Sequence, residues 1–330
     1  MKKQLLLMIC MVLLVGCSYQ DVAIKEEGEK TKVSEKLQTV NENTTVQEII
    51  NHPLFEGYGQ FLFPTGFNKP SSSMTIDNID SLLPYHSNIK TETTIEVINY
   101  MLDKVNRNQT FFYDIYSDEE KQRDSTKENT GLFFFKGNTD APLAIINAGG
   151  GFAYVGSIHE SFPHALELSK LGYNAFALQY RTDSADTACE DLATAIAFIH
   201  EHAEELEIDV ENYSIWGGSA GARITAYLGS YGTEAFIQKA YPSPAAIIMQ
   251  YTGHSDFTEN DPPTYACVGD RDGIANWQVM RQRINNLQSL GIDTEFQLFS
   301  SIGHGFGLGI GTSAEGWIEQ AILFWEKQRQ

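Results

Sequence analysis

The sequence predicts an α/β fold built on one eight-stranded, mostly parallel sheet. From residue 111 onward, short apolar runs rich in β-branched and aromatic residues recur, and amphipathic helical patterns separate the later runs. Strands that alternate with helices lie parallel to one another, with helices covering both faces of the sheet. The expected strands are residues 111–116, 132–135, 143–147, 175–180, 213–216, 245–250, 265–268 and 295–299.

Helical patterns separate most of the later strands, with apolar residues recurring at three- and four-residue spacing. The expected helices are residues 161–171, 191–206, 222–228, 277–290 and 314–327. The first two strands are joined directly by a polar loop at residues 117–130, which predicts an antiparallel edge. With 330 residues and 42% hydrophobic content, the chain can bury one large core, and we expect residues 109–330 to form one α/β domain.

The N-terminus has the pattern of a targeting segment. Two lysines precede an apolar run at residues 4–15 that is too short to span a membrane as a helix. Residues 14–17 read Leu-Val-Gly-Cys and resemble the lipobox of bacterial lipoproteins. The resemblance implies that residues 1–16 are a signal peptide and that Cys17 carries lipid, which predicts an extracytoplasmic, membrane-anchored lipoprotein. An ordinary secretory signal is the alternative.

Two segments lie between this signal and the α/β domain. Residues 17–45 are rich in Lys, Glu, Asn and Thr with few large apolar residues, which is typical of a disordered tether. Residues 46–108 combine an aromatic, turn-rich stretch with apolar positions at helical spacing. We expect this second segment to pack on the core or to line the pocket mouth.

Charge and cysteine content exclude several classes of partner. The chain has 23 Lys and Arg against 43 Asp and Glu, a net charge of −20, so neither nucleic acid nor an acidic lipid surface is an expected partner. Beyond the signal and Cys17, only Cys189 and Cys267 remain. They form no disulfide framework, and no His/Cys cluster has metal-ligand spacing. We therefore expect no metal and no cofactor, and the oligomeric state is left open.

A glycine-rich pentapeptide stands where an expected strand meets an expected helix. Residues 217–221 read Gly-Gly-Ser-Ala-Gly and fit the pattern Gly-x-Ser-x-Gly around Ser219. At a sharp strand-to-helix turn this pattern exposes the serine hydroxyl, because glycines leave room where a Cβ would collide. Ser219 is therefore the candidate nucleophile, and it requires an imidazole base that a carboxylate orients.

Two later loops hold candidates for that base and that carboxylate. Residues 268–273 read Val-Gly-Asp-Arg-Asp-Gly at the end of an expected strand, and residues 303–307 read Gly-His-Gly-Phe-Gly after the last strand. His304 is the candidate base, because it alone among the eight histidines lies in a glycine-rich loop after the last strand. Asp270 and Asp272 are both candidates for the carboxylate.

This order of serine, acid and histidine resembles the α/β-hydrolase superfamily over residues 111–327. Within it, the chain is similar to the bacterial carbohydrate acetylesterases and the hormone-sensitive-lipase-like esterases. Family loops of the form Gly-x-x-Asp carry the acid at the fourth position. The resemblance therefore implies a triad of Ser219, Asp272 and His304, with Asp270 capping the turn.

The resemblance extends to the loop that follows the third expected strand. Residues 148–152 read Ala-Gly-Gly-Gly-Phe and resemble the His-Gly-Gly-Gly oxyanion loop of these esterases, with Ala148 in place of the usual histidine. It implies that the backbone N–H groups of Gly150, Gly151 and Ala220 form the oxyanion hole. The departure at Ala148 places the geometry of the loop in question.

The implied enzyme is a serine esterase that hydrolyses short-chain, acetyl esters through a covalent acyl-enzyme, with O-acetyl groups of carbohydrates as the expected substrates. Only residues 251–263 separate the sixth and seventh strands, so we expect no large cap domain and a preference for short acyl groups. Candidates to reach the pocket from nearby loops are Tyr154, His159, His254 and Trp277.

Two other functions use the same sequence features. A serine peptidase of the prolyl-oligopeptidase type has the same triad, but no repeated blade pattern fits in residues 18–108. A non-catalytic surface binding protein on a hydrolase scaffold is the other alternative, and loss of part of the catalytic set would be expected of it.

Overall fold

The computed structural model describes residues 39–330. The predicted signal peptide, Cys17 and most of the predicted tether lie outside the described residues. Within residues 39–330, no helix has both the length and the apolar character needed to cross a membrane. The eight strands are β1 (Phe112–Tyr113), β2 (Gly131–Phe135), β3 (Pro142–Asn147), β4 (Asn174–Gln179), β5 (Asp209–Gly218), β6 (Ala246–Gln250), β7 (Thr264–Gly269) and β8 (Thr294–Phe299).

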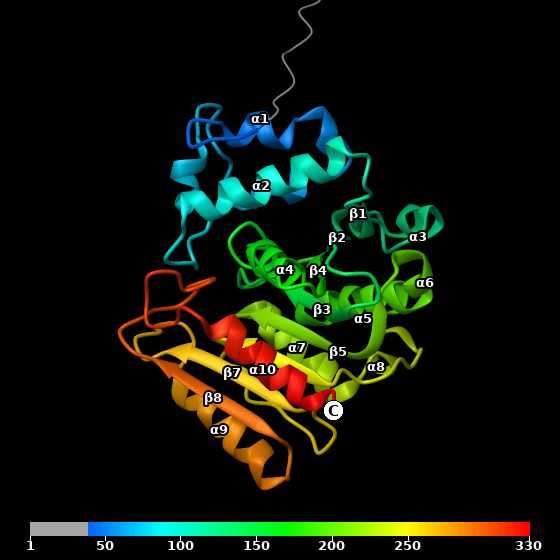
Figure 1. Ribbon diagram of the computed structural model, residues 1–330, viewed down its shortest axis with the longest axis vertical. Coiled ribbons are helices and arrows are strands. Elements are labelled where there is room, and N and C mark those ends of the chain that lie inside the picture. Colours follow the sequence, from blue (N-terminus) through cyan, green and yellow to red (C-terminus); the bar gives the residue numbers. More distant parts are fainter. Residues whose placement is uncertain (1–38) are drawn as a thin grey trace, which may run out of the picture. The chain divides into compact units, whose positions relative to one another are not determined.

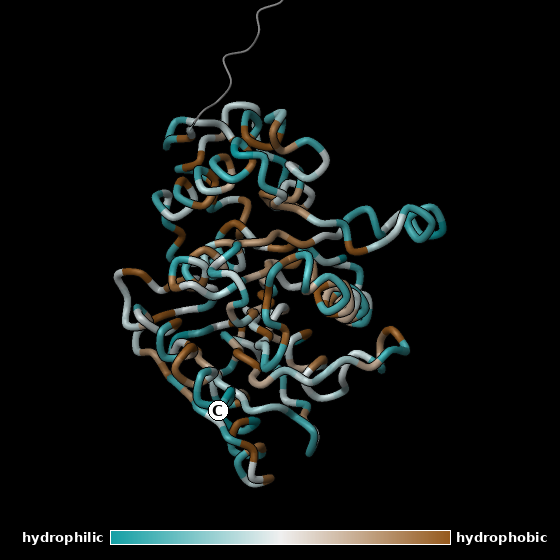
Figure 2. The backbone as a smooth tube through the Cα atoms, turned by 45° about the vertical axis from the view of Figure 1, so that its right-hand side comes forward, coloured by the Kyte–Doolittle hydropathy of each residue, from teal (hydrophilic) through white to brown (hydrophobic). Residues whose placement is uncertain are grey.

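These strands form the predicted eight-stranded, mostly parallel sheet, in the order β1-β2-β4-β3-β5-β6-β7-β8 (Figure 1). Strand β2 runs antiparallel to both β1 and β4, and all other pairs are parallel. Every residue of β2, β6 and β7 is buried, as expected for strands covered on both faces. Figure 2 shows hydrophobic segments gathered along the central strands.

The helices that accompany the sheet are α4 (Ser161–Lys170), α5 (Ala185–Glu201), α6 (Ala203–Leu206), α7 (Ala220–Tyr231), α8 (Glu234–Ile237), α9 (Trp277–Ser289) and α10 (Trp317–Gln328). All five predicted helices are present, but the predicted helix at residues 191–206 is observed as two helices, α5 and α6, and α10 begins at Trp317 rather than at residue 314. Helix α5 begins at Ala185 rather than at residue 191, because the Ser184 side chain accepts a hydrogen bond from the amide of Thr187 and caps the helix there.

The polar connection between β1 and β2 is helical, although the sequence predicts only a loop there. It contains α3 (Asp118–Arg123) and the 3₁₀ helix η4 (Ser125–Asn129). A capping box starts α3, since Ser117 accepts from the amide of Glu120 and the Glu120 carboxylate accepts from the amide of Ser117. No residue of α3 is buried, so its pattern lacks the apolar stripe on which the helix predictions depend.

Residues 39–108 form a helical segment that packs against this sheet domain. It contains α1 (Val46–Ile50), three 3₁₀ helices, η1 (Pro53–Phe55), η2 (Gly59–Phe61) and η3 (Ile76–Leu82), and the long helix α2 (Thr91–Asn106). Helix α2 contacts α4, and its buried apolar face joins the same hydrophobic core as the sheet. In Figure 1 this segment is the blue and cyan part.

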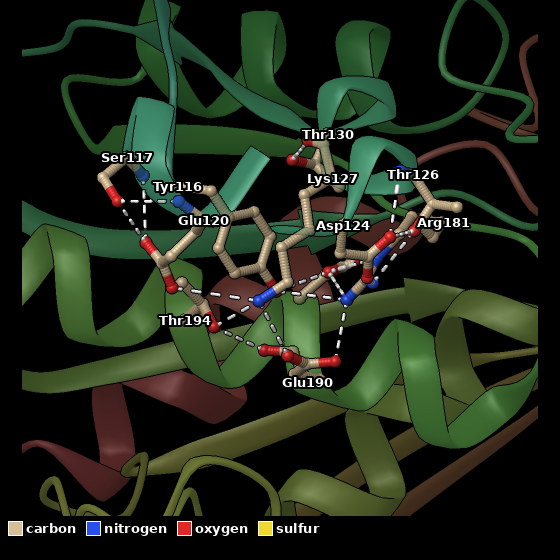
Figure 3. A network of polar contacts seen from close by, with 11 residues as sticks. Tyr116, Ser117, Glu120, Asp124, Thr126, Lys127, Thr130, Arg181, Glu190 and Thr194 are labelled. Carbon is tan, nitrogen blue, oxygen red and sulfur yellow. Dashed lines mark hydrogen bonds and ion pairs between the residues drawn. The ribbon is translucent and has the colours of Figure 1, made fainter. Parts of the chain in front are cut away.

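A buried arginine ties three of these elements together at the end of β4 (Figure 3). Arg181 binds Asp191 of α5 through Nη2 (2.7 Å) and Nε (3.0 Å), and it also reaches Glu190 (2.8 Å). Its Nη1 lies 3.1 Å from Asp124, the residue that caps η4. The hydroxyl of Tyr116 donates to Asp191 as well (2.7 Å). The buried guanidinium of Arg181 stabilises the edge of the sheet only while all of these partners are present, because losing one leaves a buried charge without compensation.

We therefore expect Asp191→Ala to lower the free energy of unfolding by about 3–5 kcal/mol, because it leaves Arg181 buried without its main partner. Asp186→Ala removes an exposed carboxylate from the same helix and should cost less than about 1 kcal/mol. Urea unfolding followed by circular dichroism measures both. Equal losses in the two variants would contradict the assigned role of the network.

Candidate active site

Ser219 lies at the sharp turn between β5 and α7. Its φ of +50° and ψ of −112° place it in a backbone region that non-glycine residues rarely adopt. Gly217 and Gly221 make this turn possible: a Cβ on Gly217 would lie 2.4 Å from the backbone of Gly221, and one on Gly221 would lie 2.0 Å from the carbonyl oxygen of Asn147. The strained turn holds the Ser219 hydroxyl clear of the strand and the helix, as the pentapeptide predicts.

The loop after β8 brings His304 to this serine. Its Nε2 lies 2.9 Å from the Oγ of Ser219, and its Nδ1 lies 2.7 Å from the Oδ2 of Asp272. The imidazole is largely buried, and the carboxylate side chain is fully so. Serine, histidine and aspartate therefore form one continuous chain of hydrogen bonds.

The two candidate carboxylates in the loop after β7 have different hydrogen-bond partners. Asp272 directs one oxygen to His304, and its other oxygen accepts from the amides of Ile274 (2.8 Å) and Ala275 (2.7 Å). Asp270 instead accepts from the amide of Ser301 at 2.6 Å and joins the two loops. Only Asp272 is placed to orient the imidazole.

The glycine loop after β3 lies beside Ser219. A Cβ on Gly149 would be 2.8 Å from the Cβ of Ser219. Gly150 and Gly151 have φ values of +139° and +64°, so the turn needs residues without a side chain. Among the hydrogen bonds within residues 39–330, none uses the amide of Gly150, Gly151 or Ala220 as a donor. These are the three amides predicted for the oxyanion hole.

A buried glutamate that the sequence reasoning missed lies behind this loop. Glu160 precedes α4, and its carboxylate accepts hydrogen bonds from the amide of Gly149 and from the hydroxyl of Tyr251 (2.8 Å). The same carboxylate lies 2.9 Å from Nε2 of His86, and both side chains are almost fully buried. Although burial raises it, the charge and hydrogen bond of His86 and the amide of Gly149 hold the pKa of Glu160 far below its ordinary value.

These contacts connect Glu160 to both halves of the site. Gly149 belongs to the glycine loop, and the ring of Tyr251 lies 4.9 Å from that of His304, edge to face. The carboxylate thus fixes the loop on one side of Ser219 and supports the base on the other. We infer that Glu160 is a positioning residue for this site.

His86 brings residues 39–108 into the same network. Its Nδ1 lies 3.0 Å from the hydroxyl of Tyr154, which also accepts from the amide of Tyr85. The neighbouring Ser87 donates its hydroxyl to the carbonyl oxygen of His304 (2.6 Å) and its amide to that of Gly305 (2.9 Å). No spacing rule relates residue 86 to residue 160 or 304, so only the folded chain reveals these contacts.

The four pocket candidates have different surroundings. Tyr154 lines a cavity beside the glycine loop. His159 is buried, with Nε2 3.0 Å from the carbonyl oxygen of Gly305, and His254 is buried against another aromatic ring. Trp277 begins α9 and packs near Arg281. Of the four, Tyr154 alone lines that cavity. Across residues 39–330, no three His, Cys, Asp or Glu side chains are grouped so that they could hold a metal ion.

Known proteins of similar structure are hydrolases. A bifunctional acetyl ester-xyloside hydrolase from Caldicellulosiruptor lactoaceticus superposes with a TM-score of 0.59 at 19% identity, over 66% of this chain and 95% of that one. A sugar hydrolase from Lactococcus lactis gives 0.53 at 22% identity, over 60% and 94%. An esterase from Thermogutta terrifontis gives 0.52 at 19% identity, over 60% and 89%.

Sequence comparison gives two further matches. Residues 134–284 match the BD-FAE family model. Endo-1,4-beta-xylanase B of Butyrivibrio fibrisolvens is 32% identical over 105 residues, which are 29% of this chain. The chain spans 16% of the length of that curated relative. The sheet order and the likeness to these solved structures show that the chain has the α/β-hydrolase fold, as its resemblance predicts.

Replacing the buried carboxylate tests the role of Glu160. Glu160→Gln keeps the shape but removes the charge that holds Gly149 and His86, so we expect kcat to fall by about tenfold or more with a smaller change in KM. Glu167→Gln, on the outer part of α4, is the matched control and should keep wild-type kcat. Steady-state hydrolysis of p-nitrophenyl acetate measures both, with thermal unfolding to verify folding. A folded Glu160→Gln enzyme with wild-type kcat would refute the positioning role.

Two buried histidines next to this network predict a loss of stability in mild acid. Burial lowers the pKa of His159 and His164 from 6.5 to about 4, because each charged imidazole would lose its contact with water. The unfolded chain binds these protons near pH 6.5 and the folded chain only near pH 4. The free energy of unfolding should therefore decrease as pH falls from about 6.5 to 4.

Urea unfolding at pH 7.5, 6.0 and 5.0 measures this dependence. His164→Phe keeps a ring against Trp317 and removes one titrating group. It should reduce the slope by up to about 1.4 kcal/mol per pH unit. If the free energy of unfolding has the same pH slope in the wild type and the variant, His164 binds its proton equally well in the folded and unfolded chain, which would contradict the prediction.

Proposed function

We propose that this protein is a serine esterase that removes short acyl groups, acetyl above all, from hydroxyl groups of carbohydrates. The observation that carries the proposal is the hydrogen-bonded chain from Ser219 through His304 to Asp272, beside three amides without an acceptor. The names of similar structures, an acetyl ester-xyloside hydrolase, a sugar hydrolase and an esterase, support this substrate class.

The geometry supports acyl transfer in two steps. His304 takes the proton of Ser219 as Oγ attacks the ester carbonyl, and the negative charge that develops on the carbonyl oxygen meets the amides of Gly150, Gly151 and Ala220. Asp272 stabilises the imidazolium without taking its proton. His304 then gives the proton to the leaving alcohol, which departs and leaves the acyl group on Ser219. Water, activated by the same base, hydrolyses that acyl-enzyme and restores the serine.

The proposed preference for short acyl groups follows from the connections around the site. Residues 251–263 join β6 to β7 without a helix or strand of their own. Because this connection contains no inserted cap, we expect it to form no deep apolar channel for a long acyl chain. We also propose that the mature protein is tethered outside the cytoplasm through lipid on Cys17, where polymeric glycans would be accessible to it.

Hydrolysis of p-nitrophenyl acetate, butyrate and octanoate tests the proposed chemistry on the chain that begins at residue 18. We expect turnover to be fastest with acetate, and Ser219→Ala to reduce it by about 10⁴-fold or more, since the whole covalent route depends on this hydroxyl. Ser289→Ala, at an exposed position of α9, is the matched control and should keep wild-type rates.

A fluorophosphonate probe gives an independent readout of the nucleophile. It should label the wild-type protein and the control, and fail to label Ser219→Ala. Turnover that survives in Ser219→Ala, or absence of both turnover and labelling in the folded wild type, would contradict the proposal. Cleavage of peptides in preference to acetylated sugars would instead assign the site to a serine peptidase.

A further inference from the structure

A cavity of about 440 Å³ lies beside the glycine loop and is not lined by Ser219. Its walls come from four segments: residues 60–67, η4, the loop at residues 153–155 and the chain that leaves β4 at residues 179–183. The volume is in the range of sites for small molecules, about 300–1,000 Å³.

The cavity is connected to the glycine loop, which lies beside Ser219. The carbonyl oxygen of Gly150 accepts from the amides of Ala153 (3.0 Å) and Tyr154 (3.3 Å), and both of these residues line the cavity. Two residues of the cavity wall are therefore hydrogen-bonded to Gly150, which belongs to the proposed oxyanion hole. A substrate with its ester at Ser219 and a bulky group beyond it could place that group here.

Phe67 lines the cavity, and Tyr85 lies beside the lining residue Tyr154. Phe67 and Tyr85 expose 43% and 39% of their surface. Both pack on Tyr154: the ring centroids are 5.4 Å apart for Phe67, and 5.7 Å apart and nearly parallel for Tyr85. A ring atom of Tyr85 lies 3.2 Å from where a Cβ would sit on Gly151. The rings therefore offer an apolar surface next to the glycine loop.

The polar part of the lining offers no unpaired positive charge. Amide side chains of Gln60, Asn129 and Gln179 contribute donors and acceptors. Arg181 is the one cation among the lining residues, and its guanidinium is occupied by Asp124, Glu190 and Asp191, as Figure 3 shows for the first two. Asp183 adds an exposed carboxylate. An acidic ligand would therefore find no free positive charge and would meet a negative one.

We propose that this cavity is a subsite for a neutral sugar ring of the leaving group, with Phe67, which packs against Tyr154 and Tyr85, stacking on the apolar face of that ring. A pyranose presents C–H groups on its faces and hydroxyl groups around its edge. It thus matches aromatic rings on one wall and amide side chains on the others. This inference rests on the proposed esterase function and adds the part of the substrate that the enzyme recognises.

The subsite would be a property of this chain rather than of the hydrolase fold alone. Residues 60–67 and Tyr85 lie upstream of residues 134–284, the part that matches the family model. The wall that residues 60–67 form belongs to the segment that also supplies His86 to the buried network. One appended segment thus contributes both to the support of the site and to its proposed specificity.

Phe67→Ala tests the subsite through substrate preference. We compare kcat/KM for an acetylated xylo-oligosaccharide with kcat/KM for p-nitrophenyl acetate, which carries no sugar. The ratio should fall roughly tenfold in the variant, the loss expected when a ring loses its stacking partner. Tyr231→Ala removes an exposed aromatic side chain at the end of α7 and should keep the wild-type ratio. An unchanged ratio in a folded Phe67→Ala enzyme would overturn the proposal.

The same variant distinguishes a sugar from an acyl group as the occupant. If Phe67→Ala reduces turnover of p-nitrophenyl butyrate more than that of acetate, the cavity holds the acyl chain and the inference is wrong. Equal effects on these two esters, together with the lost preference for the sugar ester, would support it.

Binding measured without turnover separates this inference from the proposed function. Calorimetry on Ser219→Ala should show binding of unsubstituted xylo-oligosaccharide and roughly tenfold weaker binding in the double variant with Phe67→Ala. A glucuronate-substituted oligosaccharide should bind no more tightly than the neutral one. Absence of neutral-sugar binding, or tighter binding of the acidic sugar, would overturn the subsite even if esterase activity is established. Sugar binding without any turnover would sink the esterase proposal alone.

Discussion

The strained backbone of Ser219 is the constraint on which the rest of the site depends. A serine with φ of +50° has an unfavourable backbone conformation. It keeps this conformation only because the packing of the surrounding structure fixes it. β5 and α7 supply that packing, because Gly217 and Gly221 allow the strand, the helix and the loop after β3 to approach within distances that any Cβ would prevent. The same close approach puts the glycine loop beside the serine, so strain and oxyanion geometry have one cause.

Glu160 places a buried negative charge behind the glycine loop. That charge would repel the oxyanion that develops in the proposed reaction unless neighbouring groups offset it. Three donors, from His86, Gly149 and Tyr251, surround the carboxylate and offset its charge locally. The arrangement fixes the orientation of the amide at Gly149. It also explains how the glycine loop is held although Ala148 stands where related esterases have histidine.

The parts of this structure that the sequence predicts are those encoded within short windows. Apolar runs predict the buried strands, and glycine spacing predicts the turn at residues 217–221. All eight strands are present, but β1 is shorter than the predicted residues 111–116 and β5 is longer than the predicted residues 213–216. Helix α3 was missed because a capping box between Ser117 and Glu120, not an apolar stripe, starts it. The pair of His86 and Glu160 was missed for a different reason: its residues are 74 positions apart, and packing alone brings them together. Asp270 and Asp272 differ in role only through the direction in which the turn points each carboxylate.

The position of residues 39–108 indicates whether the proposed enzyme would recognise the acyl group or the alcohol of an ester. Acetyl is too small for its recognition to give much binding energy, so discrimination among acetyl esters must come from the alcohol. Contacts to the alcohol are best made by elements that can vary without disturbing Ser219, His304 and Asp272. Residues 39–108 meet that condition, since they contact the loop of His304 through Ser87 and carry the exposed ring of Phe67 at the cavity. In the proposed function, the sheet domain would supply the reaction and this added segment the choice of substrate, which is why fold alone would not reveal that choice.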